Sequence, residues 1–93
     1  MLINQQQSGH KGSFYIGEQD NVLAEMTYTM PSPEKMIIDH TEFSDELRGQ
    51  HAGSQLLYLA VEYARTHHIK IIPLCPFAAA VFKKKPEYAD VLA

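Results

Sequence analysis

The first half of the chain alternates between apolar and polar residues in short runs, a pattern typical of half-buried β-strands. Residues that favour turns interrupt these runs, and the first turn is marked by Gly9, Gly12 and Ser13. Glu18–Asn21 predicts a two-strand hairpin, and Pro31-Ser32-Pro33 predicts a turn that cannot continue a ladder. The pattern therefore predicts four strands, at about residues 2–4, 13–17, 22–30 and 35–43.

The second half of the chain changes to a helical period. A polar segment with two glycines, Ser44–Gly53, joins the last of these strands to the helical pattern. The apolar residues that share one helix face are Leu56, Leu57, Ala60, Val61 and Ala64. This face predicts a helix from about Gln50 to His67.

A buried strand is expected directly after this helix, over Ile69–Cys75. Pro73 lies inside this run, so the strand must lie at an edge or diverge from its neighbour there. A second, short helix is expected over Phe77–Lys84, and Pro86 ends it. The remaining residues, Glu87–Ala93, are expected to form a short tail.

The predicted order of elements is four strands, a helix, a strand and a helix. The chain has 93 residues, which suffices for one domain but not for two, so we expect a single domain over residues 1–93. The predicted fold class is α+β, with a mixed, mostly antiparallel sheet, one long crossover helix and a short C-terminal helix. The crossover makes the strands before and after the long helix parallel neighbours if both belong to one sheet.

Charge and composition narrow the range of partners. The net charge of −3 argues against binding to nucleic acid, which needs a positive field, but leaves room for a small local anion site. The single cysteine cannot form an internal disulfide, and no apolar run approaches the roughly 18 residues of a membrane span. The five histidines show no zinc-ligand spacing, so we predict no metal site. We expect a cytoplasmic protein, monomeric or weakly dimeric through its edge strands.

The most specific chemistry lies in Arg48-Gly49-Gln50-His51-Ala52-Gly53, between a strand and the long helix. Glycines allow the backbone to approach a ligand closely, and the free N–H groups and dipole of a helix start favour an anion, most naturally a phosphate. Arg48 adds a fixed positive charge and bidentate donors. The alternative is a helix entry whose glycines serve packing alone, and the loop by itself does not decide between the two.

This loop resembles the acetyl-CoA-binding motif of the GNAT acetyltransferases, in which Arg or Gln is followed by x-x-Gly-x-Gly or Ala. Arg48 matches the first position and Gly53 the last, whereas His51 stands in place of the middle glycine and must adopt a permitted φ. The order of the elements is also similar over most of the chain. Cys75-Pro76-Phe77-Ala78, together with His40-Thr41 before the loop, resembles a minimal single-domain GNAT-like family with a cysteine at this strand end.

The resemblance implies a site for acetyl-CoA built from three segments. The loop would hold the CoA pyrophosphate through its main-chain N–H groups, and the backbone of Thr41–Phe43 would pair with the pantetheine arm. The strand ending at Cys75 would diverge from its neighbour to form the slot for that arm, and the second helix would pack along it. The cofactor-binding residues implied in this way are Thr41, Phe43, Arg48, Gly49, Gln50, His51, Ala52, Gly53, Ser54, Phe77, Phe82 and Lys83.

Acetyl transfer to an amine needs a base, or a nucleophile for a covalent route. The resemblance places Cys75 where the thioester ends, although a lone cysteine is also often a small buried hydrophobe. His40 and Glu42, on one strand face, are candidate bases, and both residues also fit an exposed strand face without a catalytic role. The resulting prediction is a small acetyl-CoA-dependent N-acetyltransferase that acts on an unknown amine, directly or through Cys75. The alternatives are a non-catalytic acyl-CoA-binding or interaction module and a thioester hydrolase that pairs Cys75 with His40.

Overall fold

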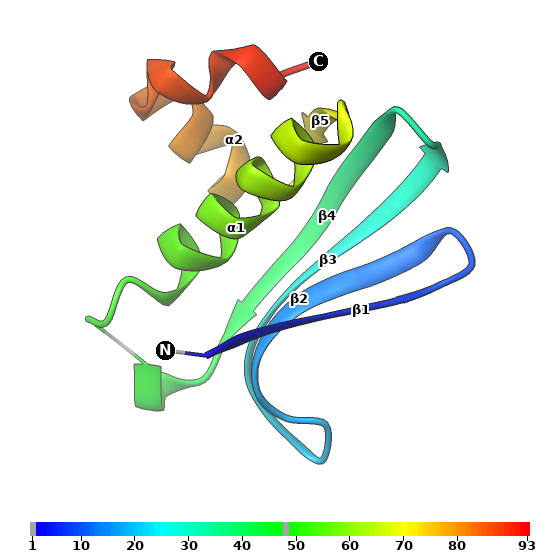
Figure 1. Ribbon diagram of the computed structural model, residues 1–93. Coiled ribbons are helices and arrows are strands. Elements are labelled where there is room, and N and C mark those ends of the chain that lie inside the picture. Colours follow the sequence, from blue (N-terminus) through cyan, green and yellow to red (C-terminus); the bar gives the residue numbers. More distant parts are fainter. Residues whose placement is uncertain (1, 48) are drawn as a thin grey trace.

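Residues 2–47 and 49–93 are described by the computed structural model, and within them five strands form one sheet in chain order (Figure 1). Neighbouring strands are antiparallel, except that β4 and β5 are parallel because α1 crosses between them. The strands are β1 Ile3–Ser8, β2 Lys11–Glu18, β3 Asn21–Ser32, β4 Lys35–Phe43 and β5 Lys70–Pro73. The helices are α1 Ala52–His67 and α2 Pro76–Lys84, with 3₁₀ segments η1 Asp45–Leu47 and η2 Pro86–Val91. The fold class is α+β, as predicted.

The predicted elements at the centre of the sheet are confirmed. β4 has the predicted bounds, and the hairpin between β2 and β3 turns within Glu18–Asn21. The long helix begins at Ala52 rather than Gln50 and ends at His67, as predicted. The parallel pairing of β4 with β5 is the pairing that the crossover predicts.

The first turn is tighter than predicted. It lies at Gly9–His10, whereas Gly12–Ser13 belongs to β2, and β1 is correspondingly longer than expected. Glycine at position 12 serves packing, because a Cβ there would lie 2.5 Å from Cζ of Tyr28. The Tyr28 hydroxyl donates to Oε1 of Gln7 and accepts from Nε2 of Gln5, both at 2.9 Å. These contacts hold β1 against the sheet.

The prolines explain two further differences from the prediction. β3 continues through Pro31 to Ser32, and the turn lies at Pro33–Glu34 instead. Pro31 is tolerated there because it lies where the register between β3 and β4 is interrupted, so no regular ladder N–H is needed. β5 is shorter than predicted and ends at Pro73.

The apolar face of α1 forms the centre of the core. Leu56, Leu57, Ala60, Val61 and Ala64 are fully buried and share one cluster with Met26, Met36 and Ile38 of the sheet. In Figure 1, α1 lies across one face of the sheet. None of the helices in the described part of the chain has the length and apolar character needed to cross a membrane.

Truncation of this face should destabilise the fold strongly. The substitution Leu57→Ala is expected to lower the free energy of unfolding by about 2–5 kcal/mol, because it leaves a cavity among closely packed side chains. Urea denaturation measures the effect. Leu59→Ala on the same helix is the matched control, since Leu59 is only partly buried. An equal loss in both variants would contradict this description of the core.

The C-terminal segment is folded against α1, so the predicted tail is wrong. η2 buries Tyr88 and Val91, and Leu92 forms a parallel bridge with Ile71 of β5. Burial raises the pKa of the Tyr88 phenol. The sequence pattern missed this segment because its apolar residues are few and follow a proline.

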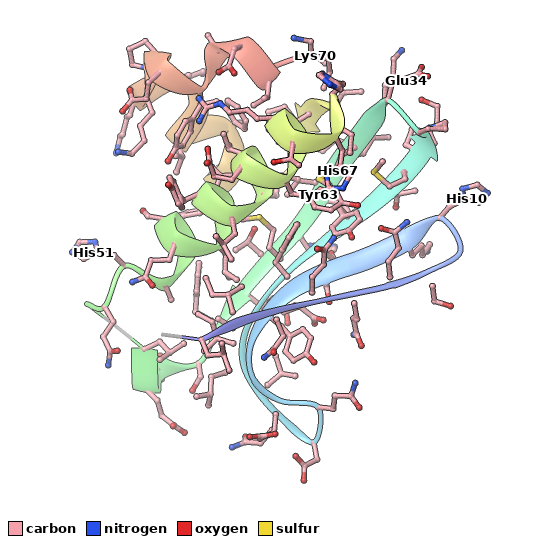
Figure 2. All side chains as sticks on the ribbon, viewed as in Figure 1. His10, Glu34, His51, Tyr63, His67 and Lys70 are labelled. Carbon is pink, nitrogen blue, oxygen red and sulfur yellow. The ribbon has the colours of Figure 1, made fainter. Side chains whose placement is uncertain are left out.

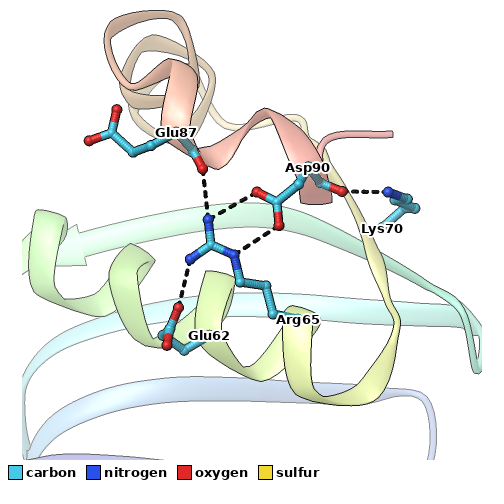
Figure 3. Close-up of polar contacts among 5 residues, drawn as sticks. All are labelled: Glu62, Arg65, Lys70, Glu87 and Asp90. Atoms are coloured by element: carbon cyan, nitrogen blue, oxygen red, sulfur yellow. Dashed lines mark hydrogen bonds and ion pairs between the residues drawn. The ribbon is translucent and has the colours of Figure 1, made fainter.

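Arg65 of α1 holds η2 in place (Figure 3). Its Nε and Nη2 donate to the two carboxylate oxygens of Asp90, each at 2.9 Å. Nη2 also donates to the Glu87 carbonyl oxygen at 2.7 Å, and Nη1 to Glu62 Oε2 at 2.7 Å. Lys70 Nζ donates to the Asp90 carbonyl oxygen. The hydrogen bonds from Arg65 lower the pKa of the Asp90 carboxyl.

This ion pair predicts a pH dependence of stability. Because the folded-state pKa of Asp90 is below its ordinary value of 3.8, its contribution is complete above that value and is lost as the pH falls through the folded-state pKa. The melting temperature of the wild type should therefore fall more steeply below about pH 4 than that of Asp90→Asn. If the melting temperatures of the two proteins fell equally steeply as the pH was lowered, the ion pair would not contribute to stability. High salt should reduce the difference between them.

Candidate functional site

β4 contains a β-bulge at Asp39. Thr27 and Tyr28 are consecutive on β3, but their partners on β4 are His40 and Ile38, which leaves Asp39 as an extra residue. The Asp39 carboxylate accepts a hydrogen bond from the Thr27 hydroxyl. Since one extra residue shifts the alternation, the side chains beyond it change faces relative to those before it.

Thr41 and Phe43 lie on the face of the sheet that α1 covers. Their partners on β3 are Met26 and Ala24, both of which are buried in the core. Thr41 and Phe43 therefore share one face of β4. The bulge thus turns a hydroxyl and an aromatic ring of β4 toward α1 and α2.

His40 and Glu42 lie on the opposite face. Their partners on β3 are Thr27 and Glu25, and both side chains are exposed. They share a face, as predicted, but this face is turned away from Cys75, which belongs to the core cluster under α1. The pairing of Cys75 with His40 that a hydrolase would need is therefore absent. Among the described residues no group of three or more His, Cys, Asp or Glu side chains is arranged to hold a metal ion.

Cys75 is the N-cap residue of α2 and is 6 % exposed. Its sulfur accepts a hydrogen bond from the Ala78 N–H at 3.4 Å and lies 3.3 Å from Oγ1 of Thr41. Pro76 occupies the first position of the helix, where its missing N–H is not needed. The positive end of the α2 dipole therefore lies at the sulfur.

The ladder between β4 and β5 ends beside Cys75. Its last pair is Ile38 with Pro73, and the N–H groups of Leu74 and Cys75 then both donate to the Ile38 carbonyl oxygen, at 2.9 and 3.2 Å. Within the described residues, β5 does not pair with Thr41–Phe43. Backbone groups of β4 are therefore available to an extended ligand along this edge.

The first turn of α1 presents main-chain N–H groups to the same side of the molecule. Its first backbone hydrogen bond runs from Gln55 N–H to the His51 carbonyl oxygen at 3.1 Å, so the N–H groups of Ala52, Gly53 and Ser54 have no intrahelical partner. The side chain of His51, the N-cap residue, makes no capping hydrogen bond. This helix start is suited to bind an anion such as a phosphate.

His51 adopts the left-handed conformation that glycine would favour, with φ 56° and ψ 34°. Histidine is among the residues that tolerate this region better than most side chains do. Figure 2 shows its imidazole pointing outward, away from the body of the protein. Gly49 also has a positive φ, 81°. The histidine at the position of the family's middle glycine therefore keeps a glycine-like backbone.

A groove of about 450 Å³ lies in front of this helix start. The rings of Phe43 and Phe77 meet edge to face in it, with centroids 5.6 Å apart. They lie over Gly53, where an added Cβ would approach Cζ of both rings to 2.5 Å. The lining residues are Phe43, Ser44, Asp45, Leu47, Gly49, His51, Ala52, Gly53, Ser54 and Phe77. Only a glycine fits between the helix start and the two rings as they stand.

The structure gathers most of the predicted cofactor-binding residues but not all of them. Those that line the groove are Phe43, Gly49, His51, Ala52, Gly53, Ser54 and Phe77. Thr41 lies beside Cys75, whereas the Gln50 side chain is exposed and bonds to the backbone of η1. Phe82 is 7 % exposed and packs against Tyr88, and Lys83 is exposed in the last turn of α2. Arg48 lies outside the described residues. The binding roles of all these residues stay predictions.

Three lining residues, Ser44, Asp45 and Leu47, were not predicted. They belong to the short segment that carries η1 between β4 and the loop. The sequence held one signal, since Leu47 is the only large apolar residue between Phe43 and Leu56. Leu47 is buried, as expected for a single large apolar residue in a polar connection, because leucine side chains pack into the core.

Comparisons with known proteins identify relatives of this chain. Residues 13–91 match the model of a family described as GCN5-related N-acetyl-transferase. The chain is 43 % identical to a GCN5-like protein of Staphylococcus aureus whose solution structure was determined by NMR. That similarity covers 97 % of this chain and 87 % of the other, with a TM-score of 0.76. No curated protein matched the sequence.

Two crystal structures with acetyl-CoA share the fold at lower identity. One is a predicted acetyltransferase of Clostridium acetobutylicum, 19 % identical, with a TM-score of 0.61 over 81 % of this chain and 56 % of that one. The other is a GNAT family acetyltransferase of Elizabethkingia anophelis, 12 % identical, with a TM-score of 0.60 over 85 % of this chain and 53 % of that one. This chain thus spans little more than half of their length.

Proposed function

Because this chain belongs to the family of GCN5-related N-acetyltransferases, we propose that it transfers the acetyl group of acetyl-CoA to an amine by way of Cys75. One observation carries the proposal: the groove at the uncapped start of α1 is lined by Phe77, two residues beyond Cys75 on the same helix. The helix start suits the pyrophosphate of CoA, and the cysteine at the start of α2 suits its thioester.

The donor binds in an extended form between these two points. Its phosphates accept hydrogen bonds from the N–H groups of Ala52, Gly53 and Ser54, and the pantetheine arm pairs with the free edge of Thr41–Phe43. Its apolar segments contact the Phe77 ring, which lies in the groove. Binding by fixed main-chain N–H groups explains how a chain with a net charge of −3 holds an anionic ligand.

The covalent route proceeds in two steps. In the first step the Cys75 sulfur attacks the acetyl carbon, the bond from that carbon to the CoA sulfur breaks, and the thiol proton ends on the CoA sulfur. In the second step the amine attacks the acetyl carbon, the bond to Cys75 breaks, and a proton of the amine returns to the cysteine. The first step exchanges one thioester for another, so the reactivity of the acetyl group is preserved for the acceptor.

A direct route would use His40 or Glu42 as the base. Both residues lie on the face of the sheet opposite to Cys75, so the amine would have to reach the acetyl carbon from that face. The structure offers Cys75 two hydrogen-bond partners and offers neither base a contact with it. These contacts favour the covalent route.

The test is to mix the purified protein with acetyl-CoA, with and without a panel of primary amines, and to follow free CoA and the intact protein mass. The expected result is one acetyl group on Cys75 without an amine, and its loss with acetylated product when an accepted amine is added. Steady release of CoA without an amine would indicate hydrolysis instead. Absence of any binding would contradict the proposal as a whole.

A further inference from the structure

Among the described residues, Thr41 is the only one whose side chain hydrogen-bonds to the sulfur of Cys75. Its Oγ1 lies 3.3 Å from Sγ. The other partner of the sulfur is the main-chain N–H of Ala78, at 3.4 Å. Thr41 reaches this position only because the bulge at Asp39 turns it toward α1. Without the bulge its hydroxyl would lie on the opposite face of the sheet.

The direction of the hydrogen bond between Thr41 and Cys75 depends on whether the sulfur is protonated. A thiol can donate its S–H to Oγ1 of Thr41, whereas a thiolate can only accept, so the hydroxyl must then donate. With the Ala78 N–H, the thiolate would have two donors and the positive end of a helix dipole. Both groups can therefore donate to the sulfur when it carries a negative charge.

Among the described residues, the charged groups on the neighbouring elements do not contact this sulfur. On β4, Asp39, His40 and Glu42 face the other side of the sheet. The basic residues of α2 lie in its last turn, at the end remote from Cys75, and Lys70 is at the start of β5. On α1, Arg65 binds Asp90 of η2, and Glu62 accepts a hydrogen bond from Arg65. The Thr41 hydroxyl and the Ala78 N–H are therefore the groups that can stabilise a negative charge on this sulfur.

We propose that Thr41 is a positioning residue for acetyl transfer: its hydroxyl donates to the Cys75 sulfur and stabilises it as thiolate when it attacks and when it leaves. This rests on the proposed function, because the benefit to catalysis requires the acetyl-cysteine. Thr41 itself exchanges no atom with the substrate. Its effect is to donate a hydrogen bond to the charged sulfur and to hold the sulfur in one orientation.

The experiment compares wild type with Thr41→Val and Thr41→Ser by the pH dependence of alkylation with iodoacetamide. Cys75 is the only cysteine of the chain, so the reaction reports on this residue alone. Valine keeps the shape and removes the donor, and the midpoint of the profile should rise by about half to one pH unit. The rate at pH 7 should fall about three- to tenfold, and serine should restore it. Thr66→Val, the same change at an exposed position near the end of α1, is the matched control and should leave the profile unchanged.

Acetylation of Cys75 by acetyl-CoA is then measured by intact mass in the same proteins. Thr41→Val should slow it by about the same factor as alkylation at equal pH. Equal alkylation midpoints in wild type and Thr41→Val would overturn the role of Thr41, whatever acetyl-CoA does. A failure of serine to restore the profile would also overturn it, because packing would then be the cause. A third outcome separates the two proposals. If the wild type formed no acetyl-cysteine but the alkylation midpoint of Thr41→Val were shifted, the covalent route would be contradicted and the hydrogen bond from Thr41 would be supported.

Discussion

Replacing Gly53 by alanine is expected to weaken acetyl-CoA binding by about 10- to 100-fold, because a Cβ at this position overfills the space over the helix start. The added atom would lie 2.5 Å from Cζ of Phe43 and of Phe77. The rings can swing outward, since Phe43 is 45 % exposed, but they then stand in the groove where the ligand binds. Valine at the same position should weaken binding further.

The fold should tolerate this change. Alanine is a better helix former than glycine by about 1 kcal/mol, which offsets the cost of moving the rings. Isothermal titration calorimetry gives the affinity, and thermal unfolding shows that the protein is intact. Gly9→Ala, in the turn between β1 and β2, is the control. A Cβ there meets no atom within 4 Å, but the φ of 61° is strained for alanine, so this variant should lose stability and still bind acetyl-CoA as the wild type does. Wild-type affinity in Gly53→Ala would place the ligand elsewhere.

Replacing Cys75 by serine is expected to abolish the acetyl-enzyme and to lower the rate of acetyl transfer at least about 100-fold. Serine is close in size and is itself a good N-cap residue, so α2 should begin as before. Its hydroxyl is not ionised at neutral pH and is a far weaker nucleophile than a thiolate. The measurement is the rate of acetylated amine formation, with intact mass for the enzyme species.

Binding is the control for this second variant. Cys75→Ser should bind acetyl-CoA with nearly the affinity of the wild type, because the phosphates are held at α1 and not at the sulfur. Transfer at the full rate by Cys75→Ser or Cys75→Ala would show that Cys75 is a small buried residue of the core and that the amine is acetylated directly. His40 and Glu42 would then become the residues to test as bases.

How far the fold follows from the sequence is best seen in β4. Its bounds follow directly from the run of apolar residues between a proline-rich turn and a polar connection. The bulge at Asp39 does not follow, because unbroken alternation from Met36 and Ile38 would put His40 and Glu42 against α1. A bulge is a property of two paired strands, and a single sequence contains no information on which partner a residue takes. The contact between Thr41 and Cys75 therefore needed the structure.

The site itself was only partly predictable. The loop before α1 could be found because glycines at a helix start have a direct physical meaning. The position of Phe82 in the core could not be predicted in this way. The side of α2 that faces the core depends on Tyr88, which belongs to a segment with no recognisable pattern. His51 was a departure from the motif, and its left-handed backbone shows that the loop conformation does not require a glycine there.

The central claim is that acetyl-CoA binds between the start of α1 and Cys75. A titration of the ¹⁵N-labelled protein with acetyl-CoA, followed by ¹H–¹⁵N correlation spectra, tests it most directly, since a chain of 93 residues gives well-resolved spectra. The account predicts saturable shifts that are largest at the amides of Ala52, Gly53 and Ser54 and extend to Cys75. Unchanged spectra, or shifts confined to the face that carries His40 and Glu42, would contradict it.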